Sequence, residues 1–234
     1  MTSFAYPFDK SILVSKKTTE LTPCTFQQTG IWEFNEIQYF YKRVFESKKD
    51  KLNIIDIGAQ TGLYTLFAKF VDNATFYAFE PFTPCYDALN ENIQLNNISN
   101  VKTFNIAISD KKENKILRVP SHKGLSTLGD NPKRFNDYNT IEVQCDTIDN
   151  LFYDTNTPID FIKCDTEGWE YYVLMGGLKT IQKYKPIIQI EYNNTNMLQC
   201  NITPEMLDKL MNELEYVKTC SHIEEYVYES LNSF

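Results

Sequence analysis

The chain has 234 residues, a mass of 27.3 kDa and a formal net charge of −8 at pH 7. Hydrophobic residues make up 42% and charged residues 23% of the sequence, which excludes global disorder and fits a folded globular protein. A chain of this length removes roughly 70% of its unfolded surface from water, so one domain with a sizeable core is expected. The acidic balance argues against a nucleic-acid partner, because phosphate backbones are bound by clustered Lys and Arg.

The six cysteines are scattered, without a Cys-x-x-Cys pair and without histidines at the spacing of zinc ligands. This distribution predicts reduced thiols rather than disulfides or a structural metal. The first ten residues lack the apolar run of a secretory signal, and no stretch reaches the roughly 18 apolar residues of a membrane span. We therefore expect a cytoplasmic protein with no membrane partner.

Residues 1–50 are rich in aromatic side chains, and their second half has helical periodicity. One face of the predicted helix carries Phe34, Ile37, Tyr41, Val44 and Phe45. We interpret residues 1–50 as an N-terminal helical extension that packs on the sheet edge of a domain spanning residues 51–234. The aromatic segment is also a candidate contact surface for a homo-oligomer, and Glu33 or Glu36 is a candidate contact at the mouth of a cofactor site.

From residue 51 onward, patterns typical of strands and helices alternate. Apolar runs predict strands over residues 51–57, 75–79, 101–108, 115–119, 141–145, 159–163 and 186–191. Helices are expected over residues 63–71, 84–95, after residue 169 and from residue 204, and residues 215–220 and 226–229 fit a closing antiparallel pair. The fold class is therefore α/β, doubly wound, with a mostly parallel sheet and a C-terminal antiparallel strand pair. Residues 110–140 hold a long polar loop, and such loops in compact domains are usually functional or mobile.

A glycine turn over residues 58–62 follows the first strand, and Glu80 ends the second. The turn lacks the middle glycine of a dinucleotide site, and Asp56 at its entrance would repel a phosphate, which disfavours an NAD-type oxidoreductase. The pattern instead favours a nucleoside joined to a cationic amine, namely S-adenosyl-L-methionine. Glu80 is then placed to accept hydrogen bonds from both ribose hydroxyls.

Several further segments extend this pattern along the chain. They are Asp-Ile-Gly-Ala-Gln-Thr-Gly at 56–62, Ala-Phe-Glu-Pro at 78–81, Ala-Ile-Ser-Asp at 107–110, Phe-Ile-Lys-Cys-Asp-Thr-Glu-Gly-Trp-Glu at 161–170 and Pro-Ile-Ile-Gln-Ile-Glu at 186–191. Across residues 30–192 the chain resembles the FkbM family of class I S-adenosylmethionine-dependent methyltransferases. It departs from the family pattern at Gln60, where Asn is usual, and at Ile148, where Leu is usual.

The resemblance implies a Rossmann-like fold and O-methylation of a hydroxyl, commonly on a sugar of a glycan, a nucleotide-sugar or a glycosylated metabolite. The cofactor-binding residues expected from the turn and the resemblance are Asp56, Gly58, Ala59, Gln60, Thr61, Gly62, Glu80, Pro81, Phe82, Ala107 and Asp110. Asp165 or Glu191 is the expected base, with Glu167 and Lys163 orienting the acceptor. His122, in the polar loop, is a further candidate base.

Two alternatives stay open at this point. The acceptor could be another small molecule, or the chain could be a non-catalytic subunit that keeps the cofactor fold. Nucleic-acid methylation is disfavoured by the acidic charge and by the lack of an Asp/Asn-Pro-Pro-aromatic motif. Several of the carboxylates could jointly hold a divalent cation, but we do not expect one and assign no metal ligand.

Overall fold

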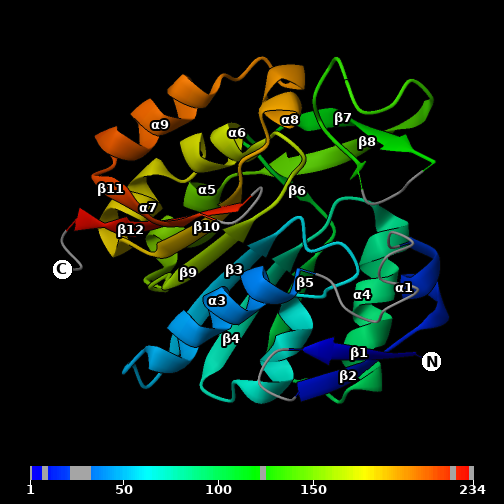
Figure 1. Cartoon of the computed structure of the whole chain (residues 1–234), viewed down its shortest axis with the longest axis vertical. Coiled ribbons are helices and arrows are strands. Elements are labelled where there is room, and N and C mark those ends of the chain that lie inside the picture. Colours follow the sequence, from blue (N-terminus) through cyan, green and yellow to red (C-terminus); the bar gives the residue numbers. More distant parts are fainter. Residues whose placement is uncertain (1, 7–9, 22–32, 122–124, 222–224, 232–234) are drawn as a thin grey trace.

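A computed structural model of the chain describes residues 2–6, 10–21, 33–121, 125–221 and 225–231. Within these residues, seven strands form the central sheet in the order β11-β12-β10-β9-β3-β4-β5 (Figure 1). The parallel strands are β3 (Leu52–Ile57), β4 (Ala74–Phe79), β5 (Val101–Phe104), β9 (Phe161–Cys164) and β10 (Ile187–Glu191), and the antiparallel pair is β11 (Tyr216–Ser221) and β12 (Glu225–Ser230). The expected α/β class, with its closing antiparallel pair, is confirmed.

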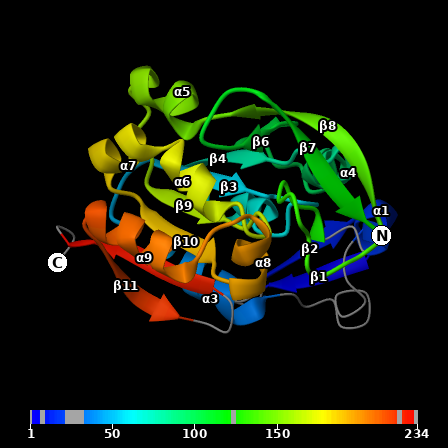
Figure 2. The same cartoon turned by 90° about the horizontal axis from the view of Figure 1, so that it is seen from above.

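The sheet is covered on both faces, because its central strands are apolar on both sides. Ile54 of β3 joins one hydrophobic cluster with α3 (Phe34–Glu46) and the 3-10 helix η1 (Thr65–Phe70). Its neighbour Ile55 points the opposite way and joins a second cluster. That cluster includes residues of α5 (Ile148–Phe152), α6 (Glu170–Met175), α7 (Leu178–Tyr184) and α9 (Pro204–Glu213), which lie across the sheet from α3 (Figure 2). The remaining helices are α1 (Lys16–Leu21), α4 (Thr83–Leu95), the 3-10 turn η3 (Tyr153–Thr155) and α8 (Asn194–Gln199).

The helix expected in the second half of residues 1–50 is α3, but it packs differently from the expectation. Phe40 is buried and contacts Phe161 of β9 with ring centroids 5.7 Å apart, so the helix lies over the middle of the sheet and not its edge. Phe34 and Phe45, which were placed on the buried face, are 37% and 45% exposed. The same region also contains an antiparallel hairpin of β1 (Thr2–Tyr6) and β2 (Lys10–Val14). The division of the chain at residue 50 stays a prediction.

The strand expected over residues 101–108 is split between two sheets. Its second part, β6 (Ala107–Ile108), pairs with β8 (Tyr138–Asp146), which also pairs with β7 (Asn114–Pro120). Asn105 lies at the break and donates hydrogen bonds to the carbonyls of Glu80 and Pro81, at 2.8 and 3.1 Å. The strands expected over residues 115–119 and 141–145 are β7 and β8, and both extend beyond the expected bounds to form this antiparallel ribbon.

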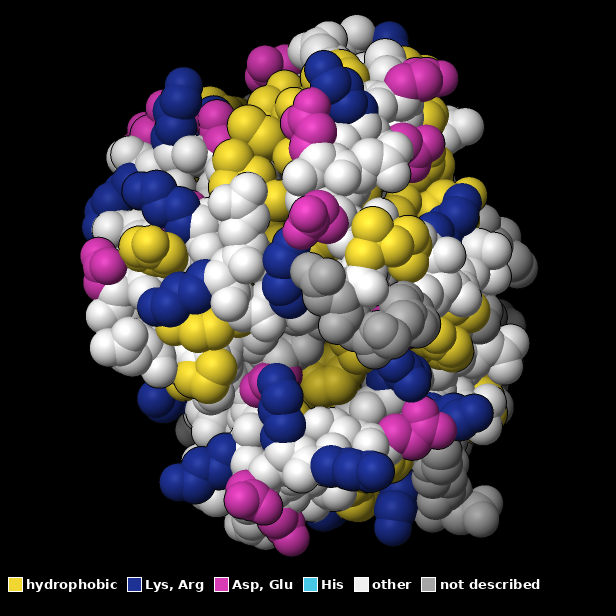
Figure 3. Space-filling model, turned by 90° about the vertical axis from the view of Figure 1, so that its left-hand side faces the viewer, with side chains coloured by type: hydrophobic (Ala, Val, Ile, Leu, Met, Phe, Trp, Pro, Cys, Tyr) yellow, Lys and Arg dark blue, Asp and Glu magenta, His cyan; other side chains and the backbone are white. Residues whose placement is uncertain are grey.

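The surface that carries α9, β11 and β12 is chemically mixed. Lys and Arg side chains on this face are interspersed with Asp and Glu, and hydrophobic side chains gather in separate patches (Figure 3). In the described part of the chain, we find no helix with both the length and the apolar composition needed to cross a membrane.

Candidate active site

A cavity of about 790 Å³ opens where the carboxyl ends of β3, β4, β9 and β10 meet. Ligands bind at this end of doubly wound sheets, because the strand-to-helix loops converge there. The cavity is lined by residues of these loops and by residues of α1, α3, β6 and β12. It therefore joins parts of the sequence that are far apart.

The glycine turn forms one wall of the cavity. Gly58 has a φ of +75°, and a Cβ atom on it would lie 1.8 Å from the carbonyl oxygen of Asp165. The backbone amides of Gly58 and Ala59 both donate to the carbonyl of Phe79, each at 3.0 Å. Glycine is thus required at position 58 by the close approach of the loop after β9, and this approach brings Asp165 next to the turn.

Glu80 faces the turn from the end of β4. One carboxylate oxygen accepts the backbone N–H of Gln60 at 2.9 Å, and the other accepts the N–H of Phe82 at 2.8 Å. These two bonds fix the orientation of the carboxylate, and each oxygen keeps a lone pair for a ligand hydroxyl. Burial raises the pKa of Glu80 to about 7, although the two amide donors oppose the shift.

Asp56 and Lys163 lie side by side because β3 and β9 pair in the register Asp56 with Lys163. Thr65 donates its hydroxyl to one oxygen of Asp56 at 2.5 Å, while the buried second oxygen has no hydrogen-bond partner among the described residues. Lys163 donates to Asp165 at 3.2 Å. Burial disfavours the charged form of Lys163, but the negative charges of Asp165 and Asp56 have the larger effect and raise its pKa. Lys163 therefore stays protonated.

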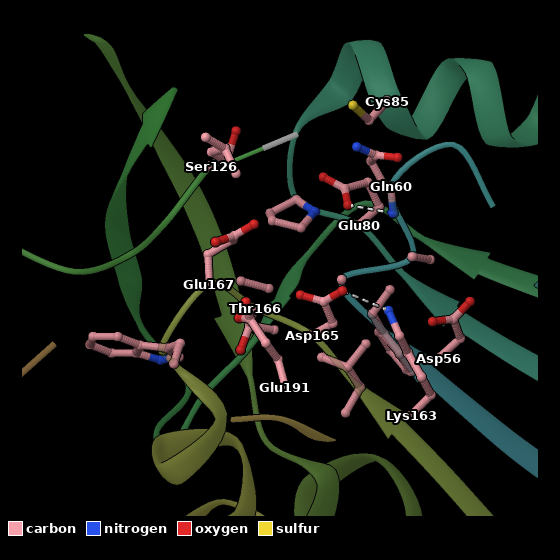
Figure 4. A pocket seen from close by; sticks show the side chains of 18 of the residues that line it. Asp56, Gln60, Glu80, Cys85, Ser126, Lys163, Asp165, Thr166, Glu167 and Glu191 are labelled. Atoms are coloured by element: carbon pink, nitrogen blue, oxygen red, sulfur yellow. Dashed lines mark hydrogen bonds and ion pairs between the residues drawn. The ribbon is translucent and has the colours of Figure 1, made fainter. Parts of the chain in front are cut away.

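Glu167 and Glu191 lie on the side of Asp165 that faces away from Lys163, so three carboxylates converge there (Figure 4). Asp165, Glu167 and Glu191 each place one oxygen within 4.8 Å of the others. We call these three residues the carboxylate cluster. Arg134 donates to Glu167 at 2.9 Å, and the Asn196 amide donates to Glu167 and Glu191 at 2.7 and 2.9 Å.

The carboxylate cluster is strongly perturbed electrostatically. Burial, followed by the charge of Asp165, raises the pKa of Glu167 to about 8. Burial, followed by the charge of Glu167, raises the pKa of Glu191 well above its ordinary value. Carboxyl groups with such values can hold or accept a proton near neutral pH, as proton transfer from a substrate requires.

Glu170, the last glutamate of the 161–170 motif, stabilises the loop before it by hydrogen bonds. Glu170 is buried and accepts the N–H and the hydroxyl of Thr166, at 2.7 and 2.8 Å. It also accepts the N–H of Gly168 at 3.3 Å. Glu170 therefore holds the loop that presents Asp165 and Glu167 to the cavity.

The structure brings most of the sequence-predicted site residues to this one cavity. The predicted residues that line it are Asp56, Gly58, Ala59, Gln60, Glu80, Pro81, Ala107, Lys163, Asp165, Glu167 and Glu191. Glu33 and Glu36 line it as well. His122 lies outside the described residues.

Four predicted cofactor residues are not among the residues that line the cavity. Thr61 is fully buried and its carbonyl accepts the Asn92 amide, and Gly62 packs against Leu89. Phe82 contributes its backbone N–H to Glu80, and Asp110 accepts the hydroxyl of Ser109. These residues shape the site through their neighbours, and the sequence pattern does not separate such support from lining.

Sequence reasoning missed three charged lining residues, Glu20, Arg134 and Glu225. Glu225 begins β12 and accepts hydrogen bonds from Gln189 and, at 3.5 Å, from the hydroxyl of Tyr64. Burial raises its pKa to about 7. An acid at the start of an ordinary alternating strand carries no local signal, whereas Arg134 lies in the long polar segment that was expected to be functional.

Comparison with known proteins identifies similar chains. Residues 56–225 match the family described as the methyltransferase FkbM domain. The methyltransferase sdnD of Sordaria araneosa is 30% identical over 178 residues, which cover 60% of this chain and 69% of that protein. Methyltransferase 1 of Beauveria bassiana is 27% identical over 167 residues, which cover 60% of this chain and 67% of that protein.

One solved structure, a methyltransferase FkbM from Methylobacillus flagellatus, superposes with a TM-score of 0.51 at 17% identity over 84% of this chain. The present chain spans only 51% of that longer protein. A Streptococcus mutans protein described as a candidate methyltransferase and solved in complex with SAH has a TM-score of 0.50 at 12% identity, covering 83% of this chain and 97% of that one. At these identities, the two structures support the fold.

Proposed function

Because the chain belongs to the FkbM methyltransferase family, we propose that it is an S-adenosylmethionine-dependent O-methyltransferase that acts on a sugar hydroxyl. The observation that carries the proposal is the single cavity that joins Glu80 at one end to Asp165 and Glu191 at the other. One end suits a ribose, and the other offers carboxylates that can take a proton from an acceptor.

The residues at the donor end fit the cofactor. Glu80 has free lone pairs for two ribose hydroxyls, and the unpartnered oxygen of Asp56 is a buried acceptor for a hydrogen bond. A cationic ligand also suits the charge of the cavity, where nine of the described lining residues carry a carboxyl group and two, Arg134 and Lys163, carry a cation. When bound, the cofactor supplies a methyl group on a positively charged sulfur.

The acceptor end suits a neutral hydroxyl. Lys163 and Arg134 are each already paired with a wall carboxylate, at 3.2 and 2.9 Å. A phosphate on the acceptor would thus meet mainly negative charge, which favours a glycan or glycosylated metabolite over a nucleotide-sugar. Asp165 or Glu191 takes the hydroxyl proton as the oxygen attacks the methyl carbon, and holding the oxygen in line supplies much of the rate.

Another neutral small molecule is the second candidate acceptor. The cavity volume of about 790 Å³ lies in the usual range for small-molecule sites. Trp169 lines the cavity, and its ring is held by a hydrogen bond to Ser109 at 3.1 Å and by stacking on Tyr172 at 4.2 Å. Such a fixed aromatic wall suits a sugar face or a planar metabolite equally well.

Calorimetry with S-adenosylmethionine, SAH and NAD tests the donor. We expect the first two to bind and NAD to give no heat; tighter binding of NAD would overturn the assignment. Transfer of a radiolabelled methyl group to matched acceptors tests the other end. Neutral glycosides should be labelled and their phosphorylated counterparts should not, and labelling of neither, with the donor bound, would favour a non-catalytic subunit.

A further inference from the structure

The carboxylate cluster holds more acceptor oxygens than its neighbours satisfy. Asp165 receives Lys163 on one oxygen, and Glu167 receives both Arg134 and Asn196 on one oxygen. Glu191 receives Asn196 on Oε1. No hydrogen bond from a described residue reaches the second oxygen of Asp165, Glu167 or Glu191. Each of the three carboxylates therefore has one oxygen that accepts no hydrogen bond from a described residue, and of these only Oε2 of Glu191 is buried.

Glu191 provides an independent observation that points to a ligand at the cluster. Glu191 lines the cavity and is only 8% exposed. Its oxygen Oε2 is buried without a partner among the described residues. A buried carboxylate oxygen left unpaired is costly, and such atoms usually face a ligand, water or an ion. In Figure 4, Glu191 points toward Asp165 and Glu167 and away from the helices behind it.

The arrangement fits a hard divalent cation better than another hydrogen-bond donor. Oxygens from three carboxylates lie within 4.8 Å of one another, which is about twice the oxygen distance of Ca²⁺. Mg²⁺ spans about 4.2 Å between two opposite oxygens, so binding of the smaller ion needs at most a small movement of these side chains. Magnesium prefers carboxylate oxygens and keeps several waters, so three protein oxygens leave positions open toward the cavity. We propose that Asp165, Glu167 and Glu191 bind a divalent cation of the Mg²⁺ type on the acceptor side of the cavity.

The position of the cation on the acceptor side defines its role. This catalytic role rests on the proposed methyl transfer, whereas the binding of the cation does not depend on it. An acceptor hydroxyl that contacts the ion has a lowered pKa. Its O–H bond breaks and the proton passes to a carboxylate oxygen that the ion does not occupy. The new O–C bond then forms as the C–S bond breaks, and the electron pair of that bond stays on the sulfur, which becomes neutral.

A titration of Mn²⁺ into the full chain tests the site. Electron paramagnetic resonance measures how much of the ion stays free at each step. We expect one Mn²⁺ per chain, displaced by excess Mg²⁺. Glu191→Gln keeps the shape of the side chain, removes one ligand charge and should weaken Mn²⁺ binding about tenfold or more. Glu213→Gln, in an exposed pair with Lys209, is the matched control and should leave binding unchanged.

A second acidic group shares Asp165 and makes the test specific. Glu33, Asp165 and Glu225 also place oxygens within 4.8 Å of one another. Glu225→Gln should therefore leave Mn²⁺ affinity nearly unchanged. If Glu225→Gln weakens binding and Glu191→Gln does not, the cation belongs to the other group and the proposal is wrong.

The carboxylate cluster could instead bind the amino group of the cofactor, which SAH also carries. A Mn²⁺ titration in the presence of SAH separates this case from a cation site. We expect Mn²⁺ to bind equally well with SAH present. Displacement of Mn²⁺ by SAH, or no Mn²⁺ binding to a chain that still binds SAH, would overturn the proposal without touching the proposed donor. As a check that does not depend on the variants, Mn²⁺ should raise the unfolding temperature of the unmodified chain.

Discussion

Glu80 is the residue on which cofactor recognition is expected to depend most. Its carboxylate is held by two backbone amides, so its orientation costs little to maintain when a ligand binds. Glu80→Gln replaces one acceptor oxygen by a donor and removes the charge that strengthens both ribose hydrogen bonds. Hydrogen bonds to charged groups contribute about 1.5–3 kcal/mol, so we expect affinity for SAH to fall at least about tenfold.

Calorimetric titration of SAH into Glu80→Gln measures this loss, and Glu213→Gln provides the control on an exposed glutamate. Affinity unchanged within about twofold would show that Glu80 does not contact the ribose.

The raised pKa of Glu80 predicts that cofactor affinity depends on pH. Burial raises this pKa to about 7, so the carboxyl group is largely protonated at pH 6 and largely ionised at pH 8. Only the ionised form accepts at both oxygens, and SAH should bind more tightly as the pH rises through 7. Titrations at pH 6, 7 and 8 measure the trend, and the Glu80 contribution should vanish in Glu80→Gln. An identical pH profile in that variant would assign the dependence to another group.

At the scale of elements, the contact between the glycine turn after β3 and the loop after β9 is the least tolerant feature of the site. Gly58→Ala would bring Cβ to 1.8 Å from the Asp165 carbonyl at a φ of +75°. Backbone atoms meet here, so no side chain can move aside, and we expect unfolding free energy to fall by about 3 kcal/mol or more. Urea unfolding measures the loss.

Gly177→Ala is the matched control for this substitution. There a new Cβ would meet the side-chain carbons Cδ1 and Cβ of Ile148 at 3.0 and 3.1 Å, a milder conflict that involves no backbone atom. We expect a clearly smaller loss of stability in this variant. Equal losses in both variants would show that the turn contributes nothing beyond ordinary packing.

At the scale of the whole molecule, buried acids make stability depend on pH. Burial raises the pKa values of Glu80, Glu170 and Glu225 to about 7 from an ordinary 4.5. The folded chain therefore holds these protons more tightly than the unfolded chain does. Their stabilising contribution is complete below about pH 4.5 and is lost as the pH rises through 7.

We expect the unfolding free energy to fall by roughly 2 kcal/mol or more between pH 5.5 and pH 8. Urea unfolding at several pH values measures the slope, and Glu225→Gln should make it shallower. If the unfolding free energy rises over this interval instead, the pKa values of these carboxyl groups are not raised in the folded chain.

The central elements of the fold are predictable because their signals are local. The apolar run that ends at Gly58 has one arrangement in which all its side chains are buried, namely a central parallel strand. The split after Val101–Phe104 was not predictable, since it depends on Asn105 bonding to carbonyls about 25 residues away in the chain. The burial of Phe40 likewise depends on Phe161, a partner that only the assembled sheet supplies.

By itself, the sequence determined the α/β class, the succession of the main strands along the chain and the acids at their carboxyl ends. These features follow from local periodicity and from the rule that loops converge at one edge of a parallel sheet. Only the tertiary structure decided how those acids group, because grouping depends on strand order and register. Asp56 meets Lys163 through the pairing of β3 with β9, and Glu225 reaches the cavity from an antiparallel strand. Glu191 keeps one buried oxygen that no described residue pairs.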